Sequence, residues 1–114
     1  MQMEQMGANA GKACALLKSM ANRSRLMILC QLAEREMSVG ELLEGLPLSQ
    51  SALSQHLSML RREEIVTTRR EAQSIKYSLD NDDARVLIQT LYELYCKGTD
   101  ENTHSTAKKE SVLI

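Results

Sequence analysis

The feature that most constrains the fold is a change in the spacing of apolar residues near residue 63. Up to that point apolar side chains recur at intervals of three and four residues, the spacing of an amphipathic helix. In residues 74–79, Ile75, Tyr77 and Leu79 alternate with polar neighbours, which is the pattern of a half-buried strand. Helical spacing returns beyond residue 80. This order predicts a mainly α domain with a two-stranded β-hairpin wing, a winged helix-turn-helix.

The expected helices begin at residues that favour helix ends. Asn22, Ser38 and Ser49 suit N-caps because their side-chain oxygens accept a hydrogen bond from an exposed backbone N–H. Glu41 completes a capping box with Ser38, and Asp80 is assigned as the N-cap of the last helix. The predicted helices span 8–20, 22–34, 38–45, 49–62 and 80–97, and the predicted hairpin joins 65–70 to 74–79 through 71–73.

The length of 114 residues allows one domain and a tail. We expect the folded domain at 8–97, because 98–114 is polar and shows no period, as in a disordered tail. The N-terminus lacks the cationic start and apolar run of a signal peptide, and no segment reaches membrane-spanning length. A cytoplasmic protein without a membrane partner is therefore expected. The net charge of −1 does not indicate a nucleic-acid partner, so the local distribution of charge must decide.

The segments 38–45 and 49–62, joined by a short turn with the only proline, have the proportions of a helix-turn-helix. Leu53, Leu57 and Leu60 share one side of the second helix and are expected to face the core. The other side carries short uncharged side chains that both donate and accept hydrogen bonds, as base edges in the major groove require. Residues 49–62 contain no acid although the chain has 15, which favours a polyanionic partner.

Double-stranded DNA is therefore the predicted partner, bound by this helix and by basic residues of the hairpin, which could reach phosphates or the minor groove. Two alternatives stay open: a polar helix face that only meets solvent, and a hairpin whose charges are merely solvated. The predicted DNA-binding residues are Ser49, Gln50, Ser51, Ser54, Gln55, His56, Ser58, Arg61, Arg62, Arg69, Arg70 and Lys76.

Four runs of residues carry a resemblance to a known family. The runs 17–22 (LKSMAN), 25–29 (RLMIL), 38–42 (SVGEL) and 48–57 (LSQSALSQHL) resemble the ArsR/SmtB winged-helix repressors. The likeness covers about residues 10–97 and is strongest to the branch with persulfide-responsive repressors and with hemolysin and nodulation regulators. It implies a homodimer, formed through the first and fifth helices, that binds an imperfect inverted repeat.

The three cysteines are too few and too widely spaced for a secreted disulfide framework, so free thiols are expected. The resemblance implies that Cys30 and Cys96 form a redox-sensing pair, which reactive sulfur species convert into a disulfide or polysulfide bridge. Such a bridge would change the spacing of the two DNA-reading helices in the dimer. The alternative is that Cys30 and Cys96 are small buried apolar residues. Cys14 is expected to pack in an interface.

Other functions are disfavoured. Metal-sensing relatives use cysteines in the segment matching 38–42, or Asp and His ligands in the segment matching 81–97, and neither ligand set is complete here. No cofactor is expected, and an enzyme is improbable because the folded region has one His and no glycine-rich phosphate loop. A regulator that competes for promoters without a thiol switch, and a protein-interaction module, stay open.

Overall fold

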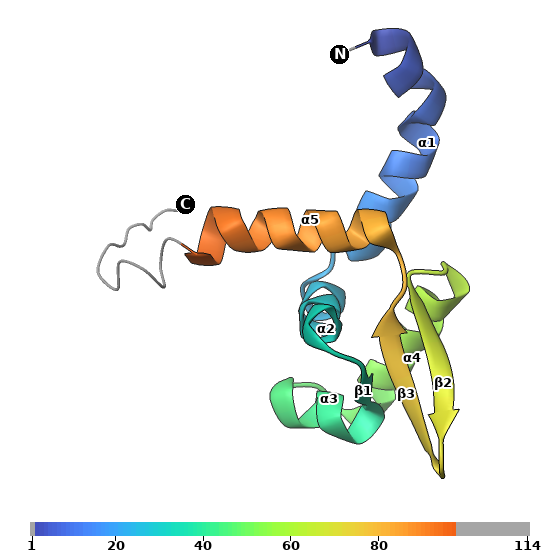
Figure 1. Ribbon diagram of the computed structural model, residues 1–114, viewed down its shortest axis with the longest axis vertical. Coiled ribbons are helices and arrows are strands. Elements are labelled where there is room, and N and C mark those ends of the chain that lie inside the picture. Colours follow the sequence, from blue (N-terminus) through green and yellow to red (C-terminus); the bar gives the residue numbers. More distant parts are fainter. Residues whose placement is uncertain (1, 98–114) are drawn as a thin grey trace.

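The computed structural model describes residues 2–97, and the segment 98–114, expected to be a polar tail, lies outside the described residues. Helices make up most of the molecule, and a small sheet projects from one side (Figure 1). In chain order the elements are α1 (Met3–Met20), α2 (Arg23–Glu34), β1 (Met37–Ser38), α3 (Val39–Gly45), α4 (Gln50–Arg62), β2 (Val66–Glu71), β3 (Ser74–Leu79), α5 (Asp82–Tyr92) and the π-helical turn η1 (Glu93–Lys97). The predicted fold class is confirmed.

Three predicted N-caps do begin their helices. Asn22 Oδ1 and Ser49 Oγ each accept a hydrogen bond, 3.1 Å long, from the backbone N–H three residues on. Ser38 and Glu41 form a reciprocal capping box at the start of α3, each side chain accepting from the other residue's backbone N–H. α1 extends further than expected, since it begins at Met3 rather than at residue 8.

The N-cap of α5 is Asn81, so the prediction of Asp80 was wrong by one residue. Asn81 Oδ1 accepts a hydrogen bond from the backbone N–H of Ala84 at 2.9 Å. The N–H of Asp80 instead donates to the carbonyl oxygen of Ile65 at 2.9 Å, which closes the base of the hairpin. Because this long-range bond keeps Asp80 with the hairpin, the helix begins one residue later.

The hairpin belongs to a three-stranded antiparallel sheet of order β1-β3-β2. In its register Arg69 lies opposite Lys76, and Arg70 lies opposite Ile75. Ala72 in the turn has a φ of 57°, a left-handed conformation that is strained for a residue with a Cβ. The third strand, β1, was not predicted, because two residues are too short to show an alternating pattern.

The core consists of apolar side chains from α2, α3, α4, the first half of α5 and the base of the sheet. It holds α4 against the body of the domain by one side only, so the opposite side of α4 faces outward. The largest fully buried side chains are Ile28, Leu29, Leu32, Leu42, Leu53, Leu57, Leu60 and Ile65.

α1 and the later part of α5 contribute little to this core. On α1, Met20 is buried, whereas Leu17 keeps 53% of its surface exposed. On α5 and η1, Val86 and Leu94 are 63% and 68% exposed. Figure 1 shows α1 projecting away from the rest of the domain. α5 crosses near the C-terminal end of α1. These apolar side chains are left largely uncovered by the chain's own core.

Candidate DNA-binding surface and thiol pair

The two sides of α4 lie as the sequence predicts. Leu53, Leu57 and Leu60 are at most 1% exposed, so they anchor the helix in the core. Ser54 and Gln55 lie on the surface, where a groove of DNA can reach them. The exposed polar residues of this side are Gln50, Ser51, Ser54, Gln55 and Ser58.

The two ends of α4 differ in chemistry. At the start, Ser49 uses its hydroxyl oxygen as the helix cap, and the first turn contains no acid. A helix N-terminus without a nearby carboxylate is favourable to a phosphate. At the other end Arg61 and Arg62 are exposed, and their side chains make no hydrogen bond or ion pair with any residue that the structure describes. His56 is half-buried at the edge of the helix.

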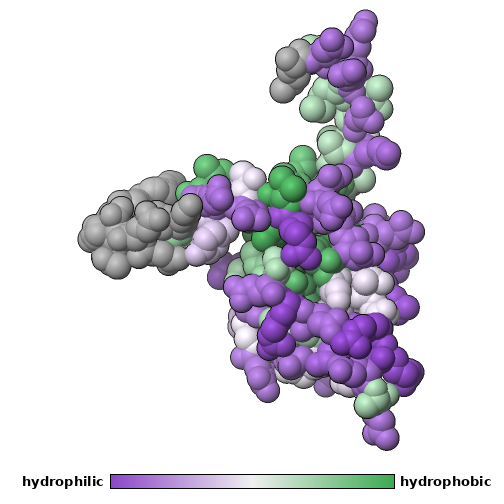
Figure 2. Space-filling view, in the orientation of Figure 1, coloured by the Kyte–Doolittle hydropathy of each residue, from purple (hydrophilic) through white to green (hydrophobic). Residues whose placement is uncertain are grey.

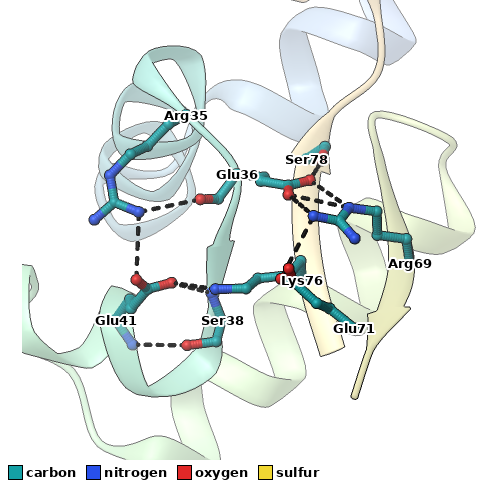
Figure 3. Close-up of polar contacts among 8 residues, drawn as sticks. All are labelled: Arg35, Glu36, Ser38, Glu41, Arg69, Glu71, Lys76 and Ser78. Atoms are coloured by element: carbon teal, nitrogen blue, oxygen red, sulfur yellow. Dashed lines mark hydrogen bonds and ion pairs between the residues drawn. The ribbon is translucent and has the colours of Figure 1, made fainter. Parts of the chain in front are cut away.

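One face of the wing is joined to the body of the domain by a carboxylate, Glu36 (Figure 3). Arg69 Nε donates to both carboxylate oxygens of Glu36 at 3.0 Å, and Arg69 Nη2 contacts the same carboxylate. Ser78 Oγ donates to Glu36 at 3.3 Å. The hydrogen bond from Arg69 is the main cause that lowers the pKa of Glu36 and raises that of Arg69.

A second carboxylate, Glu41, holds the neighbouring part of the wing. Lys76 Nζ lies 3.1 Å from Glu41 Oε1, and Arg35 Nη1 lies 3.3 Å from Glu41 Oε2. Glu41 Oε1 also accepts the backbone N–H of Ser38 at 2.9 Å. This backbone bond, followed by that from Lys76, lowers the pKa of Glu41 to about 2. Glu41 therefore caps α3 and holds a wing lysine with the same carboxylate.

The three basic residues predicted in the wing thus have different surroundings. Arg69 and Lys76 are already paired with carboxylates, and Arg69 also lies 3.5 Å from Glu71. Arg70 is exposed, and its side chain has no hydrogen bond or ion pair within residues 2–97. Sequence reasoning missed Glu36 and Glu41 as partners of the wing, since they lie 33 and 35 residues from the cations they hold.

The two cysteines predicted as a redox pair lie on α2 and on η1, the π-helical turn that continues α5. Cys30 is half-buried in α2, Cys96 is exposed in η1, and both are free thiols. Burial raises the pKa of Cys30 first, and the charges of Cys96 and Glu34 raise it further. Cys14 is exposed on α1.

A groove of about 350 Å³ opens beside Cys30, between α2 and α5. Arg85 lies along it and donates to the carbonyl oxygens of Ala33 at 3.1 Å and of Leu79 at 3.2 Å. The lining residues are Cys30, Ala33, Glu34, Arg85, Ile88, Gln89 and Tyr92. A reagent that enters this groove reaches the half-buried sulfur.

Residues 2–97 contain neither a cluster of metal-ligating side chains nor a membrane-spanning helix. No group of three or more His, Cys, Asp or Glu side chains in this span is placed to hold a metal ion. None of its helices has the length and the apolar character to cross a bilayer.

The outward polar side of α4, the supporting helix α3 and the adjacent hairpin define a winged-helix DNA-binding regulator. Residues 22–68 match the family described as bacterial regulatory protein, arsR family. This chain belongs to that arsR family and is a transcriptional regulator, not an enzyme. The resemblance noted in the sequence is confirmed.

Two relatives represent the match, one of them compared both by sequence and by structure. The transcriptional activator HlyU of Vibrio cholerae serotype O1 is 52% identical over 97 residues, which cover 85% of this chain and 90% of HlyU. The structure of reduced HlyU from Vibrio cholerae has a TM-score of 0.77 at 52% identity and covers 82% of this chain and 99% of that one. The structure of the transcriptional repressor BigR from Xylella fastidiosa has a TM-score of 0.80 at 41% identity. The match covers 84% of this chain and 98% of the BigR chain.

Proposed function

We propose that the chain is a homodimeric repressor of the cytoplasm that binds an inverted-repeat operator and releases it when reactive sulfur species join Cys30 to Cys96. The observation that supports the thiol switch is the packing of α2, which carries Cys30, against α5, whose continuation η1 carries Cys96. A bridge between them would connect α2 directly to the end of α5.

The proposed DNA contact is made by the outward side of α4. Its serines and glutamines are exposed and uncharged, and they can donate to and accept from base edges. Arg61, Arg62 and the wing add the positive charge that phosphates require. We expect Ser54 and Gln55 to read bases, while the cations set affinity rather than sequence preference.

The proposed dimer interface consists of α1 and α5. A groove of about 700 Å³ lies between them, lined mostly by apolar and small residues that include Leu16, Leu17, Val86 and Leu87. Figure 2 shows apolar surface along this part of the molecule. Packing of a second copy would cover it and place two α4 helices for half-sites roughly 34–36 Å apart. Val86→Glu is expected to give monomers in analytical ultracentrifugation, and an unchanged dimer would contradict this interface.

The sulfur chemistry follows from the exposure of the two thiols. Because burial raises the pKa of Cys30, we expect the exposed Cys96 to attack the outer sulfur of a persulfide RSSH first, forming Cys96–SSH and releasing RSH. Attack by Cys30 on the inner sulfur then forms the disulfide and releases H₂S. With a second RSSH the pair instead forms a trisulfide, with two RSH and one H₂S released. A longer bridge tolerates a wider separation of the two helices.

The relatives support regulation but leave its sign to experiment. BigR is a transcriptional repressor, whereas HlyU, at 52% identity, is a transcriptional activator. HlyU of Vibrio cholerae has also been solved in a reduced form. Because of the identity to HlyU, a regulator that competes for promoters without a thiol switch is the second candidate.

The test is a gel-shift titration with DNA from upstream of the chain's own gene, before and after anaerobic treatment with glutathione persulfide. We expect treatment to weaken binding by about 5- to 150-fold, the usual range of allosteric coupling. Mass spectrometry should show one bridge between Cys30 and Cys96.

Single cysteine variants supply the controls. Cys30→Ser and Cys96→Ser should bind DNA like the wild type and lose the response, whereas Cys14→Ser should keep it. If Cys30→Ser still responds fully, the pair is not the switch. Binding that is equal in all redox states would favour the second candidate.

A further inference from the structure

The hairpin presents three cations, and its register sorts them onto two faces. Side chains of directly opposed residues share a face of an antiparallel pair. Arg69 lies opposite Lys76, so both project from one face. Arg70 lies opposite Ile75 and projects from the other face. It is the second-to-last residue of β2.

The face with Arg69 and Lys76 is electrically balanced. Its ion pairs involve three cations and three carboxylates (Figure 3), which are Arg35, Arg69 and Lys76 with Glu36, Glu41 and Glu71. A neutral cluster gives little net attraction to a polyanion, because each cation near a phosphate brings a carboxylate with it. This face is therefore poorly suited to phosphate binding, although it is rich in basic residues.

A phosphate would also have to displace existing bonds to reach Arg69. The guanidinium contacts both oxygens of Glu36, a charge-assisted arrangement about twice as strong as a neutral hydrogen bond. If the phosphate drew the Arg69 guanidinium away from Glu36, the Glu36 carboxylate would remain beside the phosphate. The two negative charges would then repel each other. Arg70 has no such partner to give up among the described residues.

We propose that Arg69 and Lys76 are positioning residues, which fix the wing against β1 and α3 through Glu36 and Glu41, and that Arg70 is the wing residue that contacts a DNA phosphate. This assignment rests on the DNA binding proposed above but not on the thiol switch. It divides the wing into a structural face and a DNA-contacting face.

The salt dependence of DNA binding by the reduced protein separates these roles, since each lost phosphate contact lowers the slope of log K against log salt by about 0.9. Arg70→Ala should lower the slope by about this amount for each subunit on the DNA, and Arg70→Lys should keep it. Arg69→Ala and Glu36→Gln should leave the slope unchanged, with affinity reduced by about fivefold or less, as for an exposed ion pair.

A charge exchange gives the second readout. Glu36→Arg combined with Arg69→Glu keeps an ion pair between the same positions, so it should restore the affinity that Arg69→Glu alone loses. If Arg69 contacts phosphate, the exchange will not restore binding, and Arg69→Ala will lower the slope. Either result, or an unchanged slope in Arg70→Ala, overturns the assignment.

A failure of the DNA-binding proposal itself would give a different experimental result. In that case the wild-type protein itself would show no salt-dependent binding to duplex DNA, which overturns both proposals together. Steep salt dependence in the wild type with the wrong pattern among the variants overturns only the assignment within the wing.

Discussion

Arg85 on α5 donates a hydrogen bond to the carbonyl oxygen of Leu79, the last residue of β3, at 3.2 Å. Its other terminal nitrogen donates to the carbonyl oxygen of Ala33 near the end of α2, at 3.1 Å. A single guanidinium therefore joins α5, α2 and the base of the wing. Cys30 lies in α2 less than one turn before Ala33, so a bridge formed at the thiols would act on the helix pair that Arg85 connects to the wing.

The first prediction concerns this connection. Arg85→Gln should bind DNA in the reduced form, but the ratio of reduced to oxidised affinity should fall, because one contact between the thiol-bearing helices and the wing is lost. Substitutions along a coupling route change the coupling free energy by about 0.5–2 kcal/mol. Gel shifts with and without persulfide measure the ratio.

Gln89→Ala is the matched control, because Gln89 lines the same groove one turn further along α5 and its side chain makes no hydrogen bond to β3 within residues 2–97. It should keep the wild-type ratio. An unchanged ratio in Arg85→Gln would show that the signal reaches the DNA surface by another route.

The second prediction concerns acid stability. The folded-state pKa of Glu41 is about 2, below its ordinary value of 4.5, so folding favours the charged carboxylate. Glu41 therefore contributes stability above about pH 4.5, and this contribution is lost as the pH falls toward 2. The wild type should be more stable than Glu41→Gln at neutral pH, and the difference should shrink across this window in urea titrations.

Glutamine at position 41 retains an oxygen for the capping box, so the comparison isolates the charge. Glu44→Gln, on the same helix α3, is the control, since Glu44 makes no ion pair with the described residues. It should track the wild type at every pH. A Glu41→Gln difference that stays constant from neutral pH to pH 2 would contradict the prediction.

Helix α4, the proposed DNA-reading helix, could be predicted because its determinants are local. The leucine spacing of 53–60, the Ser49 cap and the absence of acids are all visible in one short segment, and the structure confirms the orientation they predict. Residue positions that depend on distant partners could not be predicted. Asp80 and Asn81 are equally good caps by type, and only the bond from Asp80 to Ile65 decides between them.

In the wing, too, the roles of individual residues could not be predicted from the sequence. Arg69, Arg70 and Lys76 are alike in the sequence as basic residues near a turn. What separates them is the position of Glu36 and Glu41 across the sheet, which depends on the short strand β1 and its register with β3. No periodicity in 37–38 signals that strand, so the division of the wing into two faces becomes visible only in three dimensions.

The third prediction concerns sequence recognition. Gln55→Ala should reduce affinity for the operator by about 1–3 kcal/mol for each half-site in which it reads a base. Affinity for unrelated duplex DNA should change little, because the exposed amide carries no charge. Arg61→Ala, in contrast, should weaken binding to both kinds of DNA and lower the salt slope. Equal losses on operator and unrelated DNA for Gln55→Ala would mean that Gln55 does not read bases.

The fourth prediction separates the two sides of α4 at adjacent positions. Leu57 is 1% exposed in the core, so Leu57→Ala should lower the free energy of unfolding by about 2–5 kcal/mol. Ser58 is exposed on the opposite side, and Ser58→Ala should change stability by no more than about 0.5 kcal/mol. Urea unfolding followed by circular dichroism measures both. The order should reverse in DNA titrations corrected for the folded fraction, with Ser58→Ala the weaker binder. If Ser58→Ala instead destabilises the fold as much as Leu57→Ala, the serine side of α4 is packed against protein and is not available to DNA.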